Sequence, residues 1–311
     1  MSDVVVRIKG LRKCYGRIVA LDGMDLEVPR GALYGLLGPN GAGKSTTFGI
    51  LCGWLQPTAG CAHVLGTPCD SLHRLRGRVA ALPQDATFPR QVPVHSQLTH
   101  YGRLSGLDRK KARSEADRVL EQVDLEDVAP RKGYELSHGM LKRVGLAQAL
   151  IGSPEVIFLD EPTAGLDPAS SRHIKDVIAS KATTATVIIS SHNLAEIQEI
   201  CSHGAILDRG HLVVDGTIDD LTRRSAEVEV EIREGATVPV DALRQAFGAD
   251  HVDTQARFIR ISFSNQDDVA WVIGKALRIL LDHDVPVLGV RRGTTLETAF
   301  LEATSHAGAA S

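Results

Sequence analysis

Residues 38–45 read Gly-Pro-Asn-Gly-Ala-Gly-Lys-Ser and satisfy the pattern G-x4-G-K-(S/T) of a phosphate-binding loop. An apolar run at residues 32–37 is typical of a buried strand, and a helical segment follows the loop. This order matters because glycines let backbone N–H groups curl around phosphate oxygens, toward which the following helix directs its positive N-terminal end. In such a loop Lys44 contacts the β- and γ-phosphates and the Ser45 hydroxyl ligates Mg²⁺. The pattern therefore predicts a nucleoside triphosphate site rather than a glycine-rich turn with a surface lysine.

Two acidic residues end a second apolar run. Residues 156–159 are apolar on both faces, as central parallel strands are, and Asp160 and Glu161 follow them directly. Ligands of open α/β sheets lie at the carboxyl ends of the strands, so we expect these acids and the loop to meet in one crevice. There Asp160 would hold Mg²⁺ through water, and Glu161 would polarise the water that attacks the γ-phosphate as general base. The alternative is two acids that end a strand at the surface.

Two more polar residues follow in the same region of the sequence. His192 follows the apolar run 186–189, and its equivalent strand end favours a contact with the γ-phosphate over a structural role. Asp167 precedes Pro168, a pair typical of a helix N-cap with proline at the first helical position. Capping alone accounts for Asp167 at this point.

The composition disfavours several classes of protein. The chain of 311 residues has 35 Lys and Arg against 38 Asp and Glu, a net charge of −3, and 4% aromatic residues. Neither a basic surface nor base-stacking platforms are expected, so nucleic acid is not a predicted partner. Five cysteines without a C-x-x-C pair disfavour a disulfide framework or a zinc site and favour a reducing cytosol. With no signal peptide or membrane-spanning run apparent, work at a membrane is expected to need a partner.

The pattern of elements predicts two domains. Apolar runs alternate with helical segments over residues 1–221, which is typical of an α/β domain, and the alternating runs 4–8 and 24–28 indicate an antiparallel edge. Helical periodicity dominates about residues 88–135, where Asp108 is the expected N-cap of a helix. The basic cluster at 109–113 is interpreted as a solvated helix end, with contact to anionic lipid as the alternative.

Residues 222–311 are predicted to form a small α+β domain with a flexible tail. Alternating runs near 228–232 and 259–263 indicate strands, and a helical pattern runs from 270 to 280. Trp271 is assigned to the core of this domain rather than to a binding platform. No cluster of catalytic residue types is found here.

The segment 136–140, Leu-Ser-His-Gly-Met, leads into a predicted helix that Gly152 and Pro154 end. A serine and a glycine at a helix start make a second anion-binding end. A single ATP already enclosed by one loop does not need this second end within the same chain. We therefore hypothesise that it serves the nucleotide of a second copy.

With this segment, roughly residues 3–220 resemble the ATP-binding subunits of ABC transporters. The resemblance implies a P-loop NTPase fold whose mixed sheet has an antiparallel edge and a helical insert, with ATP and Mg²⁺ as cofactors. It implies Lys44, Glu161 and His192 as catalytic residues. The implied metal ligands are Ser45, Gln84 and Asp160. The matching residues are Tyr15 for the adenine-stacking aromatic, Gly38, Pro39, Asn40, Gly41, Ala42, Gly43, Lys44, Ser45 and Thr46 for Walker A, Gln84 for the Q-loop, Ser137 and Gly139 for the signature, Asp160 and Glu161 for Walker B and the catalytic glutamate, Asp167 for the D-loop, and His192 for the switch histidine.

The resemblance also implies partners. Two such subunits sandwich two ATP molecules, each between one Walker A loop and the partner's signature. Gln84 is then expected to relay the nucleotide state toward a membrane permease near the helical insert. The expected location is cytoplasmic, peripheral on the inner face of the cell membrane.

Two features resemble the ABC-2 branch, the drug-resistance and antibiotic-export group. The usual signature is LSGGQ, whereas here His138 replaces the first glycine and Met140 the glutamine; Ser137 and Gly139 keep the hydroxyl and the close backbone approach. Residues 294–301 are similar to the closing motif of that branch, with an ordinary capped terminal helix as the alternative.

The predicted function is that of an ATP-hydrolysing subunit, acting as a homodimer, that powers a separate ABC-2 type permease for export. The alternative is an ABC-type ATPase that regulates a membrane or cell-envelope partner without moving a solute. A P-loop kinase or GTPase is disfavoured by the signature helix together with His192.

Overall fold

The computed structural model describes residues 4–223, 227–263 and 268–292. The chain divides into two compact units, one ending at Thr217 and the other beginning at Ile218. The motif expected at residues 294–301 and the tail expected after it lie outside the described residues. None of the helices in the described ranges is long and apolar enough to span a bilayer.

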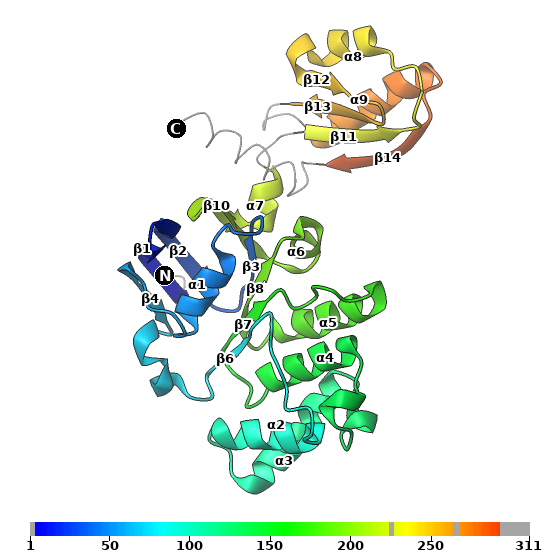
Figure 1. Ribbon diagram of the computed structural model, residues 1–311. Helices are drawn as coiled ribbons and strands as arrows, with labels where there is room; N and C mark the ends of the chain where they lie inside the picture. Colours follow the sequence, from blue (N-terminus) through cyan, green and yellow to red (C-terminus); the bar gives the residue numbers. More distant parts are fainter. Residues whose placement is uncertain (1–3, 224–226, 264–267, 293–311) are drawn as a thin grey trace. The chain divides into compact units, whose positions relative to one another are not determined.

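The first unit is built on a six-stranded sheet with the order β10-β9-β3-β8-β7-β6 (Figure 1). β6, β7, β8, β3 and β9 run parallel, and β10 closes one edge in the antiparallel sense. The central strands are buried along their whole length because both faces of the sheet are covered. The strands are β3 (Leu33–Leu37), β6 (Val79–Leu82), β7 (Val156–Asp160), β8 (Thr186–Ser191), β9 (His203–Asp208) and β10 (His211–Thr217).

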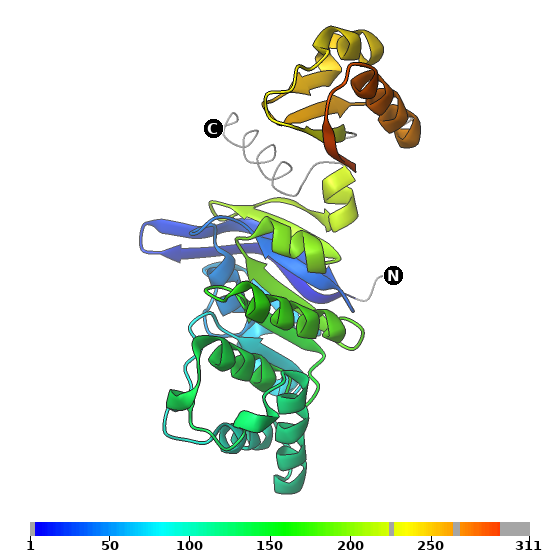
Figure 2. The same cartoon turned by 90° about the vertical axis from the view of Figure 1, so that its right-hand side faces the viewer.

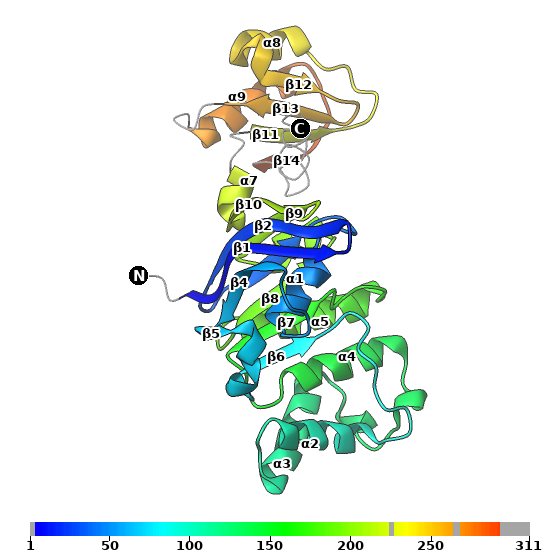
Figure 3. The same cartoon turned by 60° about the vertical axis from the view of Figure 1, so that its left-hand side comes forward.

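A second, antiparallel sheet with the order β2-β1-β4-β5 covers this unit on one side (Figure 3). Residues 4–8 and 24–28 belong to this sheet, so the antiparallel edge of the mixed sheet is β10 and not these residues. Alternation in the sequence reports one buried face, and it does not report which strands pair. The strands are β1 (Val4–Tyr15), β2 (Ile18–Pro29), β4 (Ala59–Val64) and β5 (Thr67–Pro68).

Helix α1 (Lys44–Leu51) lies between the two sheets. Its Phe48 meets Phe158 of β7 edge to face, with ring centres 5.8 Å apart, inside a core cluster that both sheets share. The opposite face of the six-stranded sheet carries α4 (His138–Ala149), α5 (Pro168–Lys181) and α6 (Leu194–Ile200), which are turned toward the viewer in Figure 2. The phosphate-binding loop therefore sits between β3 and a helix that is buried on both sides.

The helical region contains α2 (Val94–Leu104) and α3 (Arg109–Gln122). Asp108 is the N-cap of α3 and accepts a hydrogen bond of 2.8 Å from the Lys111 amide, as its position predicts. One face of α3 is fully buried and the basic residues at 109–113 are exposed. Short 3₁₀ turns complete the unit, at Cys69–Leu75, Glu126–Val128 and Gly133–Glu135.

The second unit begins with α7 (Ile218–Arg223) and continues in the order β-α-β-β-α-β, with one further 3₁₀ turn at Ala249–His251. Its antiparallel sheet has the order β12-β13-β11-β14, and both later helices share one core cluster with it. Trp271 is not in this core: it is 56% exposed, and the Lys275 ammonium lies 4.7 Å from its ring centre. The prediction that Trp271 belongs to the core was therefore wrong, and the next residue, Val272, is the buried one. The elements are β11 (Glu227–Ile232), α8 (Val240–Phe247), β12 (Val252–Thr254), β13 (Phe258–Ser262), α9 (Val269–Asp282) and β14 (Val287–Arg292).

Candidate functional site

The loop between β3 and α1 has a backbone that glycine alone adopts without strain. Gly43, with φ at +109°, is the N-cap of α1. A Cβ atom there would lie 2.7 Å from the Leu21 side chain and 2.8 Å from the Ala20 carbonyl oxygen. Within the described residues no side chain caps the helix, so its first-turn N–H groups are free to bind an anion.

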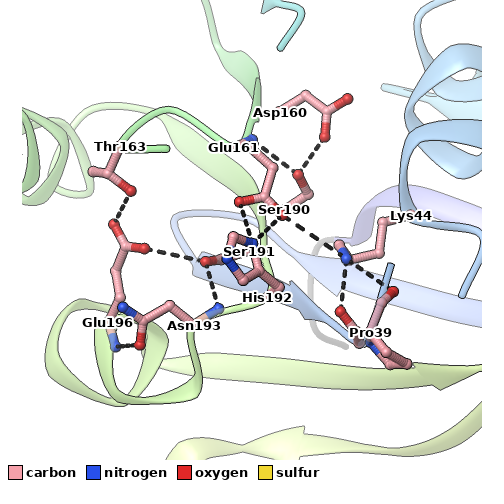
Figure 4. Close-up of polar contacts among 11 residues, drawn as sticks. Pro39, Lys44, Asp160, Glu161, Thr163, Ser190, Ser191, His192, Asn193 and Glu196 are labelled. Carbon is pink, nitrogen blue, oxygen red and sulfur yellow. Dashed lines mark hydrogen bonds and ion pairs between the residues drawn. The ribbon is translucent and has the colours of Figure 1, made fainter. Parts of the chain in front are cut away.

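The Lys44 side chain lies inside this loop. Its Nζ donates hydrogen bonds to the carbonyl oxygens of Gly38, at 2.6 Å, and Pro39, at 3.2 Å, and it stands 3.8 Å from a Glu161 carboxylate oxygen (Figure 4). Burial lowers the pKa of Lys44, and the negative charges of Glu161 and Asp160 oppose that shift. The site therefore holds a desolvated cation, beside free N–H groups, where phosphate oxygens would enter.

The two acids stand where β7 ends. Asp160 and Glu161 are both buried, and Glu161 has a left-handed backbone with φ at +49°. This conformation costs a non-glycine residue of order 1–3 kcal/mol and is typical of functional sites. Neighbouring β8 holds it in place, because the Glu161 amide donates to the Ser190 hydroxyl at 3.0 Å and to the Ser190 carbonyl oxygen at 3.2 Å.

Ser190 also donates a short hydrogen bond from its hydroxyl to the Asp160 carboxylate. One fully buried serine therefore fixes both acids, and no role was predicted for it from the sequence. The available signal was a polar pair, Ser190 and Ser191, at the end of an otherwise apolar run. Because Ser190 lies opposite Asp160 in the parallel register, only the strand pairing reveals the contact.

His192 lies against the Glu161 carboxylate. Its Nδ1 is 3.0 Å and 2.9 Å from the two carboxylate oxygens, so the pair is bifurcated. The histidine side chain is 57% exposed, whereas that of Glu161 is 8% exposed. The imidazole thus joins a buried carboxylate to the open side of the site.

A cavity of about 420 Å³ collects most of the predicted site residues. Tyr15 does not line this cavity: it is 46% exposed near the end of β1, with the Lys13 ammonium 5.1 Å from its ring centre. Asp160 is buried and does not line the cavity. The predicted residues that line the cavity are Asn40, Gly41, Gly43, Lys44, Ser45, Thr46, Gln84, Glu161 and His192.

The signature segment lies outside this cavity. Ser137 is the N-cap of α4 and accepts a hydrogen bond of 3.2 Å from the Met140 amide. A Cβ atom at Gly139 would lie 3.1 Å from the Ser170 hydroxyl, so the glycine allows α4 to approach α5 closely. Asp167 caps α5, and the Ser170 hydroxyl and amide lower the pKa of its carboxyl. Ser137 and Asp167 are exposed.

The loop after β6 joins the cavity to the signature helix. Gln84 lines the cavity, and its backbone oxygen accepts a hydrogen bond of 2.9 Å from the Lys142 ammonium on α4. Burial lowers the pKa of Lys142. A second cavity of about 680 Å³ lies between this loop, residues 84–90, and the start of α4.

The donor atoms near the loop fit a magnesium ion. The part of the chain that the structure describes has no group of three or more His, Cys, Asp or Glu placed to hold a metal by itself. The Ser45 hydroxyl, the Gln84 amide oxygen and the Asp160 carboxylate are hard oxygen donors. Mg²⁺ prefers such sites, where one or two carboxylates leave the remaining positions to phosphate oxygens and water.

Comparison with known proteins gives one consistent group of matches. The family model described as ABC transporter matches residues 21–164. The daunorubicin resistance ATP-binding protein DrrA3 of Streptomyces coeruleorubidus is 32% identical over 309 residues, which is 98% of this chain and 97% of that protein. The doxorubicin resistance ATP-binding protein DrrA of Mycobacterium tuberculosis is 35% identical over 252 residues, covering 80% of this chain and 76% of that protein. A solved structure of an ATP binding subunit of an ABC transporter superposes with a TM-score of 0.64 at 27% identity, covering 71% of this chain and 92% of that one.

Proposed function

Because the chain belongs to the ATP-binding proteins of ABC transporters, in the branch of the drug-resistance ATPases, we propose that it hydrolyses ATP to power a separate ABC-2 type permease for export. The observation that carries the proposal is the cluster of Lys44, Glu161 and His192 at one cavity of about 420 Å³. The likeness to proteins named for daunorubicin and doxorubicin resistance, over 98% and 80% of this chain respectively, supports export.

ATP binding uses the loop first. The free N–H groups at the start of α1 donate hydrogen bonds to the phosphate oxygens, and Lys44 exchanges its carbonyl partners in the loop for the β- and γ-phosphates. Tyr15, exposed near the end of β1, stacks on the adenine from outside the cavity. Pro39 and Ala42 shape the loop rather than contact the nucleotide by their side chains.

Hydrolysis then uses the acidic pair. Glu161 accepts the proton of the attacking water as the water oxygen bonds to the γ-phosphorus and the bond to the β-phosphate oxygen breaks, giving ADP and phosphate. His192 orients the Glu161 carboxylate through its Nδ1 and presents its exposed edge to the γ-phosphate. Ser45 and Gln84, with Asp160 through water, would hold Mg²⁺, which would neutralise charge on the phosphates. Ser190 keeps both acids in register.

A second copy of the chain completes each site. Ser137, Gly139 and Asp167 lie outside the chain's own cavity, and the first and last of these are exposed. We therefore place them against the nucleotide of a partner copy in a homodimer that sandwiches two ATP molecules. Gln84 lines the cavity and contacts α4, and it relays closure of the homodimer to the permease. The permease keeps the subunit on the inner face of the membrane.

The test replaces one carboxylate by an amide of the same shape. We expect Glu161→Gln to lower the turnover number by about 10²–10⁴-fold, because the general base is lost while the shape and the hydrogen bond to His192 remain. The variant should still bind ATP and form an ATP-dependent dimer in small-angle scattering. Glu155→Gln is the matched control and should keep wild-type turnover, since Glu155 lies in an exposed ion pair with Arg78. Wild-type turnover in Glu161→Gln contradicts the assigned base, and monomers at saturating MgATP contradict the dimer.

A further inference from the structure

One buried carboxylate near the site has no part in the steps above. Glu196, in the first turn of α6, is 7% exposed, and no ion pair of it with a cation is found among the described residues. Removing a carboxylate from water is costly unless other groups solvate it. Here two hydroxyl groups do so: the Thr163 hydroxyl donates to Oε1 at 2.6 Å and the Ser191 hydroxyl donates to Oε2 at 3.1 Å (Figure 4).

The two donors come from different parts of the site. Thr163 lies two residues after Glu161, in the loop that runs on to the exposed Asp167. Ser191 is the last residue of β8 and directly precedes His192. Glu196 therefore joins the segment that carries the general base to the segment that carries the histidine.

The turn around His192 is fixed by the same group of atoms. The Asn193 side chain accepts a hydrogen bond of 3.2 Å from the Glu196 amide, and the Asn193 amide donates to the Ser191 hydroxyl at 3.0 Å. The Ser191 hydroxyl thus acts once as donor and once as acceptor. The carboxylate, the two hydroxyls and the asparagine form a closed network behind the exposed imidazole.

An apolar side chain of similar volume would fill this space without the desolvation cost. The network joins the segment that carries Glu161 to the segment that carries His192, so it can set the separation of these two segments. We infer that Glu196 is a positioning residue, which holds the Thr163 loop and the His192 turn at the distance that Glu161 needs to accept a proton. This inference rests on the proposed function.

The test measures steady-state ATP hydrolysis and thermal unfolding of Glu196→Gln, Thr163→Val and the double variant. Both single changes preserve shape, and each removes one hydrogen bond of the network. We expect kcat to fall by about 10–100-fold, as small misplacements of catalytic groups do, while the KM for ATP stays unchanged. The double variant should be no slower than the slower single variant, because both changes break the same connection.

Thr99→Val is the matched control. The Thr99 hydroxyl is buried without a hydrogen-bond partner in the described part of the chain, so its removal should leave kcat unchanged and should not lower the melting temperature. The inference is overturned if Thr163→Val and Glu196→Gln hydrolyse ATP with wild-type kcat, whether or not they melt earlier, or if the two losses multiply in the double variant. Loss of turnover in Glu161→Gln tests the proposed function separately, so the two ideas fail in different experiments.

Discussion

Replacing Ser190 by alanine removes one oxygen atom from the centre of the site. Two contacts of the hydroxyl are lost: its hydrogen bond to the Asp160 carboxylate and the one that it accepts from the Glu161 amide at 3.0 Å. The first is the larger, because a hydrogen bond to a charged group contributes about 1.5–3 kcal/mol. The Glu161 amide keeps the Ser190 carbonyl oxygen as acceptor at 3.2 Å, so no buried donor is left without a partner. We therefore expect the free energy of unfolding to fall by about 2 kcal/mol.

The assay is scanning calorimetry of the full chain. In a unit of 217 residues, 1 kcal/mol corresponds to about 2–4 °C, so its transition should move down by about 4–8 °C. Ser180→Ala is the matched control, because the Ser180 hydroxyl donates at 2.6 Å to the neutral carbonyl oxygen of Val177. That bond is worth about 0.5–1.5 kcal/mol. In hydrolysis assays, the Mg²⁺ concentration for half-maximal rate should rise for Ser190→Ala alone. Equal melting shifts in the two variants, with equal Mg²⁺ dependence, would refute the assigned contact.

Two further predictions concern the loop and a distant ion pair. Gly43→Ala and Gly41→Ala both place a side chain at positive φ, but only the Cβ at position 43 meets other atoms. Gly43→Ala should therefore lower the free energy of unfolding by about 1–3 kcal/mol more than Gly41→Ala does. Equal urea midpoints for the two variants would contradict the clash. Hydrogen bonds from the Arg118 side chain and the Gly152 amide hold the pKa of Glu115 below its ordinary 4.5, so its stabilisation is present above that pH and is lost as pH falls through the folded pKa. Glu115→Gln should therefore have a lower urea midpoint than wild type at neutral pH and an equal one in strong acid, and a constant difference would contradict the linkage.

Much of the fold was predictable because the decisive contacts are local. The family and the fold class predicted from the sequence are confirmed by the matches and by the parallel sheet with its buried strands. The glycine loop and the cap at Asp108 depend on residues within a few positions of each other, where propensity and hydrogen bonding act directly.

The unpredicted features depend on contacts between distant parts of the chain. Ser190 meets Asp160 only through the register of β7 and β8, and Glu196 meets Thr163 across 33 positions. Trp271 was misplaced because a helical pattern fixes the buried face only to within about one residue, and Val272 takes the inward place. Pattern and spacing do not encode such pairings.

Because the backbone at Glu161 is left-handed, thermal stability and ATP hydrolysis favour different residues at this position. A glycine there would relieve about 1–2 kcal/mol of steric cost and would remove the carboxylate that we propose as the proton acceptor. Directed evolution that selects for thermal stability alone will therefore favour glycine at position 161 and yield variants that do not hydrolyse ATP. Stabilisation of the subunit for biotechnology should keep Glu161 and rely on substitutions at other positions.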